Sequence, residues 1–233
     1  MTENKMHFNR QQLARMMDFS AVRAQSDYHD IKRMAEGARI HNAIAVFALP
    51  AWTSVLRDML EDRPDIAIGG VVGFPSGGDT TESKVFQAQA LLSMGCQELD
   101  MVINIGKVRS DLLVEIEQDV RSVVQASQDR PVKVILECVH LSEDQIREAC
   151  LASARAGAAF VKTGTGWADC SNIAHYISLM YDCVGDRLGI KAAGGIRDLN
   201  TVIDLYERGA RRFGVGVESA VNILEQCDIT GSQ

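Results

Sequence analysis

Short apolar runs alternate with segments of helical periodicity along the whole chain. Most of the runs are continuously apolar, as expected for parallel strands that are covered by helices on both sides. They predict eight strands, at Met16–Phe19, Ile44–Leu49, Ile66–Gly73, Glu98–Asn104, Val132–Cys138, Ala159–Lys162, Gly189–Ala192 and Arg212–Val215.

The segments between the runs have the apolar stripes and end signals of helices. Residues 113–124 and 146–154 each place apolar side chains on one helical face. Ser142 with Gln145, and Asp79 with Glu82, fit the capping box that begins a helix, and Asp198 is predicted to cap the helix after the seventh strand. Glycines are predicted to end three helices, at Gly95, Gly157 and Gly209.

The order of these elements predicts an α/β fold, a (β/α)₈ TIM barrel formed by residues 1–233 as a single domain. Eight strands, each followed by a helix, fit the 233-residue chain, because such barrels commonly have roughly 200 to 250 residues. The alternative is an open doubly wound sheet, which binds ligands where the strand order reverses.

The composition of the chain argues against nucleic-acid and membrane partners. The net charge is −7 without a basic block, which argues against nucleic acid. The N-terminus is polar, and no run approaches the roughly 18 apolar residues of a membrane span, so we expect a cytoplasmic protein without a membrane partner. None of the cysteines forms a C-x-x-C pair, so they are predicted to be reduced and mostly buried. They are Cys96, Cys138, Cys150, Cys170, Cys183 and Cys227.

The sequence predicts neither a metal nor a cofactor. It has no H-E-x-x-H motif or cluster of histidines and acids that would indicate a metal, and no G-x-G-x-x-G follows an early strand. The expected ligand is therefore a small molecule.

Two lysines are the strongest candidates for chemistry. Lys162 and Lys191 each stand at the end of an apolar run, directly before a glycine-rich loop. A lysine there is poorly solvated, and a second ammonium group on a neighbouring strand, roughly 4.8 Å away, repels it, so one of the two is expected to be neutral. A neutral lysine attacks carbonyl carbons and forms a Schiff base. The alternative is that both lysines extend to solvent.

Acidic residues occur on the same strands. Asp100 lies inside an apolar run, where it either forms a buried salt bridge with a lysine or transfers protons, and the two roles are compatible. Asp18 lies at the end of the first run. Glu137 and His140 close the fifth, and His140 is either a base or a structural histidine.

Two glycine-rich loops are candidate anion sites. Residues 194–197 and 214–219 each precede a predicted helix, and backbone amides at a helix N-terminus attract phosphate. The alternative is that these glycines only form tight turns. Glu218 would oppose a phosphate if its side chain pointed inward.

At this level of detail the chain resembles the deoxyribose-phosphate aldolase family, from about Leu13 to about Leu224. The resemblance rests on Val71-Val72-Gly73-Phe74-Pro75, Asp100-Met101-Val102-Ile103-Asn104-Ile105-Gly106, Val132-Lys133-Val134-Ile135-Leu136-Glu137, Phe160-Val161-Lys162-Thr163-x-Thr165-Gly166 and Ile190-Lys191-Ala192-x-Gly194-Gly195-Ile196-Arg197. It implies a metal-free class I aldolase that reversibly cleaves 2-deoxyribose 5-phosphate to glyceraldehyde 3-phosphate and acetaldehyde.

The resemblance also implies roles for individual residues. Lys162 matches the Schiff-base lysine, Lys191 the second lysine that perturbs it, and Asp100 the aspartate of a water-assisted proton relay. The implied substrate-binding residues are Asp18, Ser20, Thr165, Gly166, Gly194, Gly195, Gly214 and Gly216.

The chain departs from the family pattern around the predicted phosphate site. Gly164 and Ala193 replace residues of the two lysine motifs, and Trp167 replaces a smaller aromatic or a basic residue. Gly216-Val217-Glu218 stands where the family commonly has two serines. Two alternatives therefore stay open: a related lysine-dependent aldolase acting on a different or non-phosphorylated aldehyde, and a non-catalytic barrel that binds a sugar phosphate or a partner protein. Assembly into a homo-oligomer is also left open.

Overall fold

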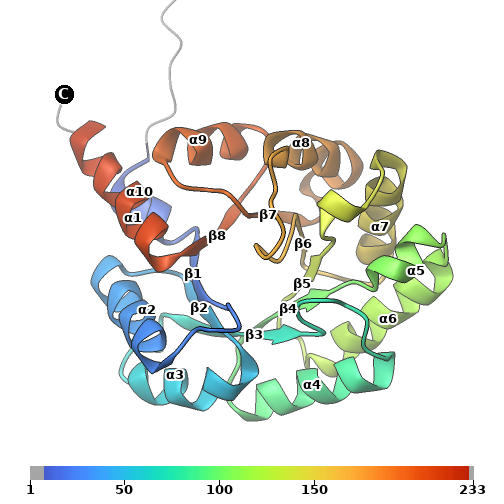
Figure 1. Ribbon diagram of the computed structural model, residues 1–233, viewed down its shortest axis with the longest axis horizontal. Coiled ribbons are helices and arrows are strands. Elements are labelled where there is room, and N and C mark those ends of the chain that lie inside the picture. Colours follow the sequence, from blue (N-terminus) through green and yellow to red (C-terminus); the bar gives the residue numbers. More distant parts are fainter. Residues whose placement is uncertain (1–7, 231–233) are drawn as a thin grey trace, which may run out of the picture.

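A computed structural model of the chain describes residues 8–230, and the side chains of residues 8–227. Its eight strands pair in parallel and in sequence order, and β1 pairs with β8 to close a barrel (Figure 1). All eight predicted strands are confirmed within a few residues, and the open-sheet alternative is wrong. The strands are β1 (Met17–Ala21), β2 (Ala45–Ala48), β3 (Ala67–Val72), β4 (Glu98–Val102), β5 (Val132–Ile135), β6 (Phe160–Lys162), β7 (Gly189–Ala193) and β8 (Arg212–Gly216).

Helices surround the barrel and cover its outer face (Figure 1). The α-helices are α1 (Arg10–Ala14), α2 (Tyr28–His41), α3 (Thr53–Met59), α4 (Thr81–Ser93), α5 (Ile105–Arg109), α6 (Leu113–Ala126), α7 (Glu143–Arg155), α8 (Ile173–Val184), α9 (Leu199–Glu207) and α10 (Val217–Thr230). Short 3₁₀ turns lie at η1 (Pro50–Trp52), η2 (Cys138–His140) and η3 (Gly185–Arg187). No helix among residues 8–230 is long and apolar enough to cross a membrane.

The predicted helix ends are confirmed with one exception. Ser142 forms a capping box with Gln145, and the Asp198 side chain accepts the Thr201 amide. The expected box at Asp79 is wrong, because Thr80 caps α4 and Asp79 instead accepts a hydrogen bond from the Gln87 amide. The glycines predicted to end helices all have positive φ, at Gly95, Gly157 and Gly209.

The main apolar core lies between the strands and the helices. The interior of the barrel contains charged side chains as well as apolar ones. A small apolar cluster of Ala45, Phe47 and Val71 occupies one part of that interior. Gly69 lies beside the Phe47 ring, and a Cβ atom there would come within 2.1 Å of the ring. Buried charged side chains from β1, β4, β5, β6, β7 and β8 occupy the rest. The fold therefore encloses a buried polar layer inside an apolar shell.

Candidate active site

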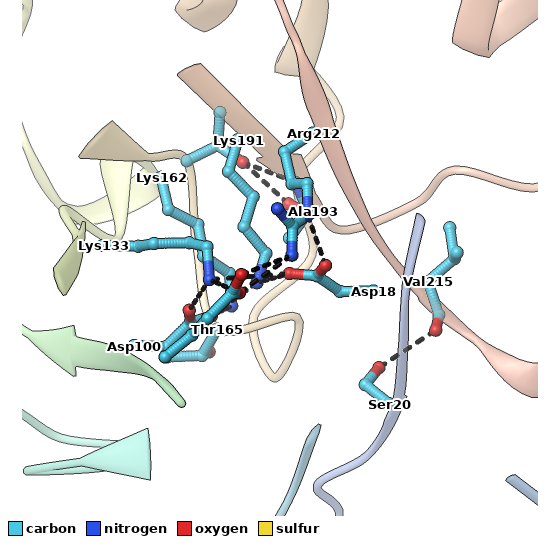
Figure 2. A network of polar contacts seen from close by, with 12 residues as sticks. Asp18, Ser20, Asp100, Lys133, Lys162, Thr165, Lys191, Ala193, Arg212 and Val215 are labelled. Carbon is cyan, nitrogen blue, oxygen red and sulfur yellow. Dashed lines mark hydrogen bonds and ion pairs between the residues drawn. The ribbon is translucent and has the colours of Figure 1, made fainter. Parts of the chain in front are cut away.

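Asp100 lies at the centre of this polar layer. Its Oδ2 atom accepts hydrogen bonds from the Nζ atoms of Lys162, at 2.7 Å, and Lys191, at 2.6 Å (Figure 2). Asp100 and Lys191 are each 1% exposed and Lys162 is 7% exposed. The alternative that the two lysines extend to solvent is therefore wrong.

The strand register brings the two lysines together. Lys162 ends β6 and lies directly opposite Lys191 on β7. β7 continues to Ala193, so the prediction that this strand ends at Lys191 is wrong. The expected repulsion between the two ammonium groups is offset, because the Asp100 carboxylate bridges them. The predicted salt bridge of Asp100 forms with both lysines rather than one.

Three further charged residues complete the layer, and sequence reasoning did not single them out. The fully buried Lys133 lies 2.5 Å from Glu98 Oε2 and 3.4 Å from Asp100 Oδ1. Arg212 reaches Glu98 Oε2 at 2.8 Å. The signal that could have found Lys133 is a lysine between Val132 and Val134 in an otherwise apolar run.

Asp18 joins Lys191 to Arg212 within the layer. Its Oδ2 lies 2.6 Å from Lys191 Nζ, and its Oδ1 accepts a 2.5 Å hydrogen bond from Arg212 Nε. Burial by itself would raise the pKa of Asp18, but Lys191, Arg212 and Lys133 outweigh it and lower that pKa to about 2.

The same balance of forces acts on Asp100. Burial opposes its ionisation, yet the charges of Lys162, Lys191 and Lys133 outweigh burial and hold the pKa of Asp100 well below its usual range. The layer thus contains Lys133, Lys162, Lys191 and Arg212 against Asp18, Glu98 and Asp100, which is one more basic than acidic side chain.

A cavity of about 600 Å³ opens above this layer, at the C-terminal ends of the strands. The residues predicted to be catalytic or to bind the substrate all line it, namely Lys162, Lys191, Asp100, Asp18, Ser20, Thr165, Gly166, Gly194, Gly195, Gly214 and Gly216. Sequence reasoning missed Phe47 and Phe74 on its wall and Arg23 and Arg33 near its mouth. A carbonyl compound in this cavity would meet the amines at its floor.

Glu137 supports the loop that follows Lys162. Its backbone has φ of 52°, and its buried carboxylate accepts the Thr165 amide at 3.1 Å. A Cβ atom at Gly164 would lie 2.6 Å from Glu137 Oε1, which explains the glycine at this place in the lysine motif. His140 is exposed and does not line the cavity, so its interpretation as a base is wrong.

The predicted anion site lies on the far side of the cavity from Phe74. Gly194 and Gly195 have φ of 105° and 74°, a backbone that favours glycine, and Arg197 follows them on the cavity wall. Glu218, in the first turn of α10, also lines the cavity. The cavity lining at this place therefore includes one basic residue, Arg197, and one acidic residue, Glu218.

Within residues 8–230, no three histidine, cysteine, aspartate or glutamate side chains are grouped so that they could hold a metal ion. None of the six cysteines forms a disulfide within the part of the chain that the structure describes, and all except the half-buried Cys183 are buried.

A closed (β/α)₈ barrel with ionisable side chains converging at the C-terminal ends of its strands is the architecture of a barrel enzyme. The model of the DeoC/LacD family aldolases matches residues 9–223. The chain belongs to this aldolase family, and it is therefore a lyase.

Curated relatives and solved structures agree with this family. The chain is 41% identical to a deoxyribose-phosphate aldolase of Klebsiella pneumoniae, over 97% of this chain and 92% of the relative, and 41% identical to one of Sinorhizobium medicae, over 92% and 87%. An aldolase called QR15 superimposes with a TM-score of 0.87 at 27% identity, covering 97% of this chain and 99% of QR15. The tetrameric deoxyribose phosphate aldolase of Aeropyrum pernix superimposes with a TM-score of 0.85 at 25% identity, covering 94% and 92%.

Proposed function

We propose that the chain reversibly cleaves 2-deoxyribose 5-phosphate to glyceraldehyde 3-phosphate and acetaldehyde, through a Schiff base on Lys162. The observation that carries this proposal is the bridge from Lys162 Nζ through Asp100 Oδ2 to Lys191 Nζ, at 2.7 and 2.6 Å, on the floor of the cavity. Family membership supports the reaction class, and the names of the relatives support the substrate.

The proposed reaction balances in four steps. The neutral amine of Lys162 adds to C1 of the open-chain sugar and loses water to give an iminium ion. A base removes the proton of the C3 hydroxyl, the C2–C3 bond breaks, and its electrons form an enamine while the phosphorylated aldehyde leaves. Protonation of the enamine carbon and addition of water then release acetaldehyde and the free amine. Asp100, ionised and within reach of both amines, moves these protons directly or through water.

The proposed roles of the remaining lining residues follow from their positions. Asp18 holds Lys191, and Ser20, whose hydroxyl donates to the Val215 carbonyl, faces the substrate from β1. The remaining residues bind the substrate mainly through their backbone, at Thr165, Gly166, Gly194 and Gly195 in loops and at Gly214 and Gly216 in β8. The tetrameric relative supports assembly into a homo-oligomer, which the sequence leaves open. Cytoplasmic location stays a prediction.

Enzyme-coupled detection of glyceraldehyde 3-phosphate, formed from 2-deoxyribose 5-phosphate, tests the reaction. Product formation that depends on both the enzyme and the sugar phosphate supports the proposal. If the protein forms an imine but releases no product from this sugar, the substrate assignment is wrong while the lysine chemistry stands.

Replacement of Lys191 by leucine should raise the pH at which the imine forms and reduce turnover by roughly 10²-fold or more. Lys162 would lose its cationic neighbour and release its proton less readily, and Asp100 would lose one of its two closest amines. The pH profile of imine trapping measures the first effect. A profile identical to that of the wild-type protein would count against this role.

A non-phosphorylated substrate is a second candidate, because Gly216, Val217 and Glu218 offer no hydroxyl donor and one carboxylate to a phosphate. Arg197 and the glycine amides at 194–195 partly offset this repulsion. We expect a modest preference for 2-deoxyribose 5-phosphate over 2-deoxyribose in kcat/KM.

Glu218→Ser should increase that preference, and Glu218→Gln, which removes only the charge, should give part of the increase. The ratio of kcat/KM for the two sugars is the measurement. A wild-type ratio above about 10³, or roughly 4 kcal/mol of transition-state binding, would show that phosphate is bound firmly despite Glu218.

A further inference from the structure

The segment between β6 and α8, residues 163–172, bends inward over the mouth of the barrel (Figure 1). In a closed ring of eight strands β6 lies opposite β2, and β1 and β3 flank β2. The segment nevertheless contacts Val22 and Arg23, which follow β1, and Phe74, which follows β3. The chain directly after Lys162 therefore extends to the far wall of the site.

Two hydrogen bonds join this segment to the β1 loop in opposite directions. The indole Nε1 of Trp167 donates to the Val22 carbonyl at 2.9 Å, and Nη2 of Arg23 donates to the Gly166 carbonyl at 2.6 Å. The Trp167 ring also meets Phe74 edge-on, with the ring centroids 5.9 Å apart and the planes at 83°. We call Arg23 and Trp167, with these contacts, the clasp.

The clasp lies at the cavity wall, with Arg23 on its inner side and Trp167 outside the lining. Thr165, Gly166, Phe74 and Arg23 line the cavity, whereas Trp167 is not among the lining residues and is 39% exposed. On the near side the segment is fixed by the Thr165 amide, which donates to Glu137. Thr163 is hydrogen-bonded to Ala193 and the buried Cys170 packs beside Gly194, so the clasp is what ties the middle of the segment to the opposite wall.

We propose that Arg23 and Trp167 are positioning residues, which hold the segment after Lys162 across the mouth and fix the cavity wall around the imine. This inference rests on the proposed function of Lys162. A misplacement of about 1 Å in an active site can cost about 10²-fold in rate, so release of the segment should lower kcat more than it raises KM.

The closure of the clasp can be tested without any substrate. The chain has two tryptophans, Trp52 and Trp167, so Trp52→Phe leaves Trp167 as the single fluorescent indole. In that background, Arg23→Ala should make acrylamide quench Trp167 more efficiently. Arg208→Ala is the matched control, because Arg208 is an exposed arginine that follows α9 and pairs with Asp204 of that helix. Equal quenching with and without Arg23 would overturn the proposal, whatever the activity.

The positioning role is tested by kinetics on folded variants. Trp167→Phe keeps a ring against Phe74 and removes the indole N–H, and it should lower kcat and the rate of borohydride-trapped imine formation by roughly tenfold, with KM changed less. The double variant Arg23→Ala/Trp167→Phe should have nearly the same kcat as the less active of the two single variants. Both hydrogen bonds hold the same segment, so losing the second adds little once the first is lost.

The positioning role would be overturned if Trp167→Phe had the wild-type kcat and rate of imine formation. It would also be overturned if the fold-losses in kcat of the two single variants multiplied in the double variant. Failure of the proposed function gives a different result, since no imine would then form in the wild-type protein while the quenching difference would persist.

Discussion

Replacement of Lys162 by alanine or methionine should abolish imine formation and lower kcat/KM by roughly 10⁴-fold or more. The amine of Lys162 is the proposed nucleophile, and loss of a covalent nucleophile removes the whole catalytic route rather than one contribution to it. Methionine is the more informative replacement, because it fills most of the volume of the lysine side chain and differs chiefly in the missing amine.

The fold should survive this substitution. The polar layer would then contain three basic and three acidic side chains, and Asp100 would keep Lys191 at 2.6 Å and Lys133 at 3.4 Å. Lys107→Ala, at a half-buried lysine outside the cavity that pairs with Glu115, is the matched control and should leave the rate unchanged. Substantial turnover in a folded Lys162→Met protein would mean that another group carries the reaction.

Asp100→Asn should lower kcat by roughly 10² to 10⁴, since the amide keeps the shape of the carboxylate but cannot take up a proton. The pKa of Asp100 lies well below its usual range, so its carboxylate is ionised in the wild-type protein at all moderate pH values. The ratio of wild-type to variant kcat should therefore stay constant between about pH 5 and 8. A ratio that falls toward one at acid pH would indicate that Asp100 titrates in this range.

The Asp100→Asn substitution also has a cost in stability. It leaves Lys162 and Lys191 without the carboxylate that bridges them, and loss of one partner of a buried ion pair typically costs about 3–5 kcal/mol. Activity should therefore be measured below the Tm of the variant, with circular dichroism confirming the fold. Near-normal turnover in that folded protein would reduce Asp100 to a structural role.

The fold could be predicted because local patterns specify it. Each strand lies within a short, mostly apolar run, and eight repeats of strand and helix leave little choice of topology. The error at Asp79 arose because Thr80, one residue later, offers an equally good cap, and sequence alone does not rank the two.

The site was predictable where its residues lie at strand ends next to glycine loops, as at Lys162. It was less predictable inside the barrel, because closure brings together residues that are distant in sequence: Arg212 meets Glu98 across the interior, 114 positions away. The Asp100 bridge between the two lysines likewise depends on the register of strands β4, β6 and β7, because a one-residue shift would turn these side chains to the other face. The contacts of Trp167 with the β1 loop have no sequence signal at all.

Trapping of the imine tests the central claim most directly. The wild-type protein is incubated with acetaldehyde and borohydride, digested, and its peptides are analysed by mass spectrometry, in parallel with Lys162→Met and Lys107→Ala. We predict an N-ethyl group on the peptide that contains Lys162 in the wild-type and Lys107→Ala proteins, and its loss in Lys162→Met. Labelling of Lys191 in place of Lys162, or undiminished active-site labelling in Lys162→Met, would contradict this assignment.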